Sequence, residues 1–173
     1  MQRDALAAFV RATQRDVHRF VTHLSSPHEA DDLAQETYLR ALPALAKFAG
    51  RSSARTWLLS IARHTAADAV RAAVRRPRTD GVVDWDTVDA RSQMVRSAVD
   101  EAVLLRALIA DLDPDRREAF VLTQVLDLGY AEAAEVCGCP VGTIRSRVAR
   151  AREDLVEAMH ARSNSRSRRA GGF

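Results

Sequence analysis

Apolar residues recur at every third or fourth position through most of this 173-residue chain, and this helical spacing limits the possible folds more than any other feature. Only 5% of the residues are aromatic, and Gly and Pro are scarce, which favours helices over strands. No segment alternates apolar and polar residues as a half-buried strand would. The sequence therefore predicts an all-α protein of two small helical domains joined by a flexible linker.

Three helices are predicted in the first domain, residues 1–77. The first spans about residues 4–24. Ser26 can cap the second helix and Glu29 can complete a capping box, so the second helix should begin there. Pro43 lies inside the apolar pattern of that helix and predicts a kink or an early end. A third helix should follow the Ser52–Ser53 loop.

The second domain, residues 101–162, begins with a helix predicted at about 101–111. The next helix should be capped by Asp113 and ended by Gly129, because carboxylates cap helix N-termini and Gly is common after helix C-termini. A short helix over 131–137 then precedes a further turn.

Charge is unevenly distributed along the chain, although the formal net charge is only +3. Residues 51–78 carry seven Arg and one Asp, whereas residues 79–101 carry six acids and two Arg. We interpret 78–100 as an acidic linker. The last residues, 163–173, are rich in Ser, Arg and Gly and predict a disordered tail.

The 131–137 helix, the turn at 138–140 and the helix predicted over 141–161 together describe a helix-turn-helix. Ile144, Val148 and Ala151 have the spacing of a core-facing stripe. The polar side chains of the second helix are left outside: Thr143, Arg145, Ser146, Arg147, Arg150 and Arg152. Arg reads guanine, and Ser, Thr and Arg bind phosphate, so this helix fits a major groove. The alternative is a solvated basic helix, but such helices usually pair their charges.

Several functions are not indicated by the sequence. Cys137 and Cys139 are too close for a good disulfide and have no second ligand cluster, so we expect packing or turn roles, with a redox or metal role as the alternative. No catalytic triad or phosphate-binding glycine loop is indicated, so we expect neither an enzyme nor a cofactor. No run of 18 apolar residues and no signal peptide occur, so we expect a cytoplasmic protein without membrane insertion.

The helix-turn-helix resembles region 4.2 of the extracytoplasmic-function (ECF) sigma factors. Residues 140–147 read Pro-Val-Gly-Thr-Ile-Arg-Ser-Arg, and Arg-Ala-Arg follows at 150–152. In that family the second helix recognises the −35 promoter element. The resemblance implies that the −35 contacts are Thr143, Arg145, Ser146, Arg147 and Arg150.

Residues 31–38, Asp-Asp-Leu-Ala-Gln-Glu-Thr-Tyr, resemble region 2.2, which binds the clamp helices of the polymerase β′ subunit. The resemblance implies that core polymerase is bound by Asp31, Asp32, Gln35 and Glu36. Without the resemblance, the same run reads as a solvated helix face. Acidic and amide groups can dock on a basic coiled coil and set its register.

Residues 48–58 and 61–64 resemble regions 2.3 and 2.4, which melt the −10 element and hold an unpaired base. Trp57 lies on the apolar stripe, and we expect it in the core. Many relatives have an aromatic residue where this chain has Ala54, so basic and polar groups would carry more of the recognition. The expected −10 contacts are Arg51, Ser52, Ser53, Arg55, His64, Arg71, Arg75 and Arg76.

The resemblance covers residues 4–159 and is nearest to the actinobacterial sigma C type. It implies an alternative sigma factor that binds the RNA polymerase core (β′ clamp helices and β flap) and promoter DNA, with an anti-sigma factor as a further possible partner. Two other classes stay open on the residues alone. A free-standing helix-turn-helix regulator would not need the 31–36 surface, and an interaction protein would leave the basic helix without a role.

Overall fold

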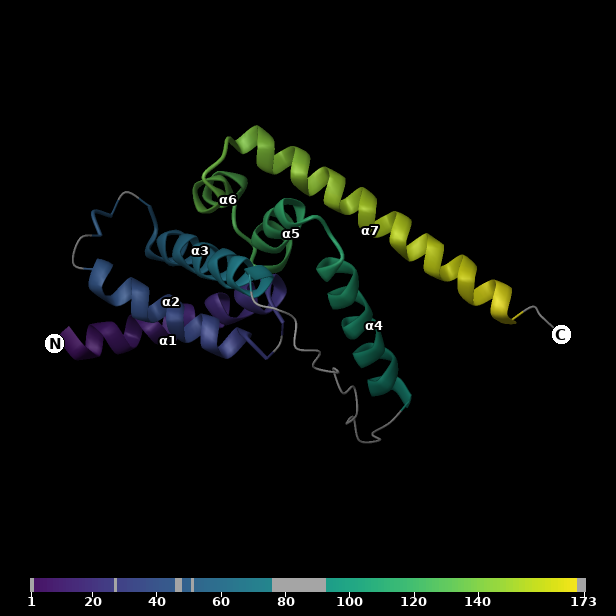
Figure 1. Cartoon of the computed structure of the whole chain (residues 1–173), viewed down its shortest axis with the longest axis horizontal. Coiled ribbons are helices and arrows are strands. Elements are labelled where there is room, and N and C mark those ends of the chain that lie inside the picture. Colours follow the sequence, from purple (N-terminus) through teal and green to yellow (C-terminus); the bar gives the residue numbers. More distant parts are fainter. Residues whose placement is uncertain (1, 27, 46–47, 51, 76–92, 171–173) are drawn as a thin grey trace.

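The computed structural model describes residues 2–26, 28–45, 48–50, 52–75 and 93–170, without the side chains at 2, 3, 5, 74, 75, 93–101 and 163–170. Every regular element in these ranges is helical, which confirms the predicted all-α fold. Figure 1 shows α1–α3 packed as one group, with α4, α5, η1 and α6 contacting this group and α7 lying on the far side of α5 and α6. The elements are α1 (Gln2–Leu24), α2 (Ala30–Leu45), α3 (Ala54–Arg75), α4 (Gln93–Ala110), α5 (Pro114–Phe120), η1 (Val121–Val125), α6 (Tyr130–Cys137) and α7 (Val141–Ala170).

The core of the first group forms where α1 and α3 present their apolar stripes to each other and to α2. Phe20, Val21, Leu58 and Leu59 are at most 1% exposed. Thr37 is also fully buried, and its hydroxyl donates to the Leu33 carbonyl at 2.7 Å, so this buried hydroxyl is paired. Trp57 packs against this core only partly buried, with its ring centroid 4.9 Å from that of Phe48.

At the start of α2, the Glu29 half of the predicted capping box is present, but the helix begins later than predicted. The Glu29 carboxylate accepts hydrogen bonds from the backbone N–H and the hydroxyl of Ser26, at 3.3 and 2.8 Å. The helix itself begins later, at Ala30. It ends at Leu45, shortly after Pro43, as expected for a residue that cannot donate a backbone hydrogen bond.

The turn between α5 and α6 corrects the role predicted for Gly129. The predicted cap is confirmed, because Asp113 accepts from the N–H groups of Asp115 and Arg116. The helix then widens into the π-helical segment η1, in which the Leu126 N–H donates to Val121 O at 2.9 Å. Asp127 takes the left-handed conformation (φ 56°), whereas Gly129 is extended and is the N-cap residue of α6. Asp is more common in this conformation than most L-residues because its short polar side chain can hydrogen-bond to the local backbone.

Two helices of the second group are longer than predicted. α4 begins at Gln93, inside the predicted linker 78–100, and residues 78–92 of that linker lie outside the described residues. α7 continues to Ala170, past the position where we predicted a disordered tail. Neither 93–100 nor 163–170 contains Gly or Pro, so no residue there interrupts a helix that has already formed.

The two groups of helices touch each other. α3 packs on α6, and α1 packs on both α4 and α5. None of the helices in the described part of the chain is long and apolar enough to cross a bilayer. The contacts between the groups determine which candidate site residues face solvent.

Candidate nucleic-acid interface

The turn between α6 and α7 sets the orientation of the predicted recognition helix, α7. Gly138 ends α6 in the left-handed conformation (φ 64°), which Gly adopts without steric cost. Ile144 and Ala151 are 0% exposed and Val148 is 1% exposed, so the predicted apolar stripe is the buried face. The opposite face of the first turns of α7 therefore points to solvent, where DNA could reach it.

The exposed face of α7 contains two kinds of arginine. Arg145 and Arg150 are exposed and make no ion pair with any described residue. Arg147 is half-buried: its guanidinium pairs with Asp115 and lies 3.8 Å from the Cys139 sulfur. The first two guanidiniums are free to bind DNA, whereas Arg147 must first leave Asp115.

The short polar residues Thr143 and Ser146 already make hydrogen bonds within the first turns of α7. The Ser146 hydroxyl donates to Thr143 O at 2.9 Å. Thr143 is half-buried at the first turn, where its N–H donates to Pro140 O at 2.9 Å. A hydroxyl that donates still has acceptor capacity, so both side chains can accept from a base or bind through water.

The predicted polymerase-binding surface lies on α2. Asp31, Asp32 and Gln35 are exposed. The Asp31 carboxylate lies 3.0 Å from His18 Nε2 of α1, and Glu36 accepts from Arg40 Nε at 2.8 Å. The four predicted residues therefore share one exposed edge of α2.

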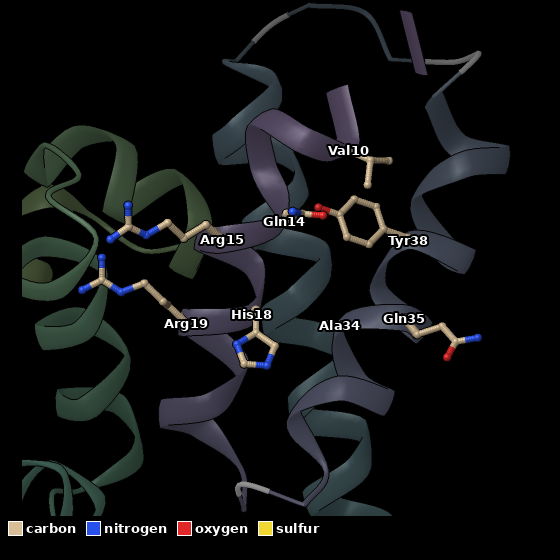
Figure 2. Close-up of a pocket in the computed structure, with 8 residues that line it drawn as sticks. All are labelled: Val10, Gln14, Arg15, His18, Arg19, Ala34, Gln35 and Tyr38. Atoms are coloured by element: carbon tan, nitrogen blue, oxygen red, sulfur yellow. The ribbon is translucent and has the colours of Figure 1, made fainter. Parts of the chain in front are cut away.

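A groove separates α1 from this edge of α2. Figure 2 shows the Gln35 amide pointing outward, while the Tyr38 ring leans toward α1. The Tyr38 hydroxyl lies 2.9 Å from Thr13 Oγ1, which fixes the ring. Burial raises the pKa of Tyr38, so the phenol stays protonated at neutral pH. The groove is lined by Val10, Gln14, Arg15, His18, Arg19, Ala34, Gln35 and Tyr38.

The predicted −10 contacts on α3 do not form one surface. The guanidinium of Arg55 donates to Asp16 at 2.6 Å and to the Leu126 carbonyl at 2.6 Å, so it faces the second group of helices. His64 is exposed two and a half turns further on and therefore lies on the other side of α3. Arg71 is exposed on that side and pairs with Asp68.

Of the remaining predicted −10 contacts, the two serines lie at the start of α3, and the arginine side chains fall outside the part of the chain that the structure describes. The Ser53 hydroxyl accepts from the Thr56 N–H at 3.0 Å, so it helps to start α3. Ser52, just before it, is half-buried. Arg51, Arg76 and the side chain of Arg75 lie outside the described residues.

The ion pair between Arg63 and Glu118 joins the two groups of helices and is absent from the sequence prediction. Arg63 Nε lies 2.6 Å from Glu118 Oε2, and the side chains are only 23% and 13% exposed. Burial opposes the charged form of Arg63, but Glu118 outweighs it and the pKa of Arg63 is raised. No sequence signal could reveal a pair so far apart along the chain.

Replacing Glu118 with Gln should loosen the contact between the two groups. The amide leaves the Arg63 charge largely buried and unpaired, which should cost about 1–3 kcal/mol of docking free energy. Small-angle X-ray scattering should show a larger radius of gyration. Asp68→Asn, which removes the exposed pairs with Arg40 and Arg71, should leave the radius unchanged. Equal radii in both variants would contradict this role for the pair.

The cysteines pack as predicted. Cys137 is buried, and burial raises its pKa to about 12, so it stays a protonated thiol at neutral pH. Cys139 is half-buried in the turn before α7. In the described part of the chain, no three His, Cys, Asp or Glu side chains are placed to hold a metal ion.

Comparisons with known proteins agree with this architecture. The family profile "Sigma-70 region 2" matches residues 9–76, and "Sigma-70, region 4" matches residues 102–155. The chain is 54% identical over 158 residues to the ECF RNA polymerase sigma factor SigC of Mycobacterium tuberculosis, covering 88% of this chain and 82% of that protein. It is 38% identical over 156 residues to the ECF sigma factor EcfG of Rhodopseudomonas palustris, covering 88% and 83%.

A solved structure shares the fold as well. The sigma factor RpoE from Bartonella quintana, crystallised in complex with the anti-sigma factor NepR, superposes with a TM-score of 0.70 and 26% identity. The match covers 90% of this chain and 97% of that one. The predicted ECF resemblance is confirmed by these relatives. The chain therefore belongs to the sigma-70 family, within its extracytoplasmic-function group.

Proposed function

We propose that this chain is an alternative sigma factor that binds the RNA polymerase core, recognises −10 and −35 elements and initiates transcription of a specific set of genes. The observation that carries the proposal is the exposed face of α7. Arg145 and Arg150 lie on this face and make no ion pair with a described residue, while Ile144 on the opposite face is fully buried. An anchored basic helix of this kind suits the major groove. Family membership supports initiation over the free-standing regulator.

The two groups of helices would divide the work. The acidic edge of α2, Asp31 to Glu36, would dock on the β′ clamp helices, and α4–α7 would bind the −35 duplex and the β flap. The −10 strand would meet the side of α3 that carries His64 and Arg71. Arg55 could join it only after leaving Asp16 and Leu126. The polymerase would supply the chemistry, so this chain would act in the cytoplasm without being an enzyme.

An anti-sigma factor is a further partner in this proposal. Support comes from RpoE, which was crystallised with NepR and is matched over 97% of its length. Exposed apolar side chains on neighbouring helices could receive such a partner: Val103 and Leu105 on α4, Val156 and Met159 on α7.

Transcription with sigma-free core polymerase on a genomic fragment library tests the proposal. Discrete start sites that depend on the chain would support it and would reveal both promoter elements. Binding to specific duplex DNA without any binding to core would instead identify a free-standing regulator.

Replacing both Gln35 and Glu36 with Ala should weaken core binding by about fivefold or more, since an interface residue that matters contributes more than about 1 kcal/mol. Binding of the full chain to the −35 duplex should not change, because the proposed −35 contacts are on α7 and not on α2. Asp4→Ala, which removes an exposed acid near the start of α1, is the matched control and should bind core normally. Core affinity unchanged in the double variant would refute this surface.

A further inference from the structure

A second groove lies at the junction of the two helix groups and shares only Arg19 with the groove between α1 and α2. It encloses about 490 Å³, within the size range of small-molecule sites. Three elements that are distant in sequence form its walls: α1, α4 and η1. Its lining consists of Arg19, His23, Ala102, Val103, Leu105, Arg106, Ile109, Gln124 and Val125.

The polar part of this junction is positively charged and lacks counter-charges. Arg19 and Arg106 are exposed, and neither makes an ion pair with a described residue. Figure 2 shows the Arg19 side chain extending from α1 toward the green ribbons of the second group, away from Tyr38. Two guanidiniums, one from each helix group, therefore line one groove whose described lining contains no carboxylate.

Two buried polar atoms at or near this groove are also unpaired in the described part of the chain. Nδ1 of His23 and Nε of Arg117 are buried without a hydrogen-bond partner. Arg117 donates only to the carbonyls of Ala110 and Leu112. Unpaired buried polar atoms are uncommon in folded proteins, and each needs a physical reason.

The electrostatic field at His23 agrees with this arrangement. Burial lowers the pKa of His23, and the charges of Arg106, Arg19 and Arg117 lower it further. These three cations face the imidazole from α4, α1 and α5, while η1 contributes only the neutral Gln124. A bound anion would relieve the repulsion among the cations.

We propose that this groove binds the polyphosphate group of a small molecule, held by Arg19 and Arg106. Guanidiniums match phosphate geometry with paired N–H donors, which favours phosphate over a single carboxylate. The apolar walls formed by Val103, Ile109 and Val125 can receive the organic part of a nucleotide. Because the two arginines come from regions matched as sigma-70 region 2 and region 4, the ligand would also hold the two groups together.

Calorimetric titration of the full chain with inorganic pyrophosphate and with ATP, both without divalent metal and at constant ionic strength, tests this site. Either Arg19→Ala or Arg106→Ala should raise the Kd at least about tenfold, because each removes a charge-assisted contact. Arg11→Ala is the control, since Arg11 is exposed and unpaired on the same helix α1 but does not line the groove.

The outcomes separate the possible ligands. Tighter binding of ATP than of pyrophosphate would identify a nucleotide, and equal binding would identify the phosphate chain alone. Absence of binding by both, or an equal loss in Arg11→Ala, would overturn the proposal by showing only general charge attraction. Because transcription with core polymerase is measured separately, failure here leaves the sigma-factor proposal standing.

Discussion

Replacing Ile144 with Ala should lower the free energy of unfolding of the α4–α7 group by about 2–5 kcal/mol. Ile144 is fully buried, and its neighbours on the stripe, Val148 and Ala151, are equally enclosed. The substitution removes three carbons from a packed site and leaves a cavity, because the helices cannot close over it completely. Urea denaturation followed by circular dichroism measures the loss.

The control for Ile144→Ala lies on the same helix. Val156 is 51% exposed, so Val156→Ala should change stability by less than about 0.5 kcal/mol. The Ile144 variant should also lose −35 binding in proportion to the fraction unfolded. Similar stability of the two variants would mean that the first turns of α7 are not anchored as the structure shows.

Replacing Arg145 with Ala should weaken binding to the −35 duplex by about 1–3 kcal/mol, which is about five- to 150-fold. The Arg145 side chain is exposed and has no ion pair among the described residues, so its removal should not disturb the fold. We propose that this guanidinium makes a bidentate contact with a guanine edge. Fluorescence anisotropy with promoter DNA and random DNA measures the effect.

The anisotropy measurement distinguishes a base contact by Arg145 from a phosphate contact, because the two predict different losses of affinity on promoter and on random DNA. A base contact predicts a large loss on promoter DNA, a small loss on random DNA and relaxed choice at one position. An equal loss on both duplexes would make Arg145 a phosphate contact. Arg162→Ala, an exposed arginine near the far end of the described α7 side chains, should leave promoter specificity unchanged.

Local features of the site were predictable because they depend on residues that are close in sequence. Helical spacing alone placed Ile144, Val148 and Ala151 on one buried face. The Asp113 cap was likewise predicted, since its partners are the next residues along the chain. Such signals arise from the period of the helix and from backbone groups that must find a partner.

Some local geometry was beyond the sequence patterns. Gly129 is predicted to end the preceding helix, but that helix ends earlier, Asp127 takes the left-handed conformation, and Gly129 is the N-cap residue of α6. The π-helical segment η1 accounts for the shift, because it ends the preceding helix with wider hydrogen-bond spacing. Packing of the surrounding helices decides such a change, and turn preferences do not encode it.

By itself, the sequence determined the helical class, the buried face of the recognition helix and the basic character of its exposed face. Only the tertiary structure decided which arginines remain free. Arg55 turns to Asp16 and Leu126, and Arg63 turns to Glu118, while Arg145 stays unpaired. Local patterns repeat with the helix, whereas the partner of a charged side chain depends on which distant helices pack together.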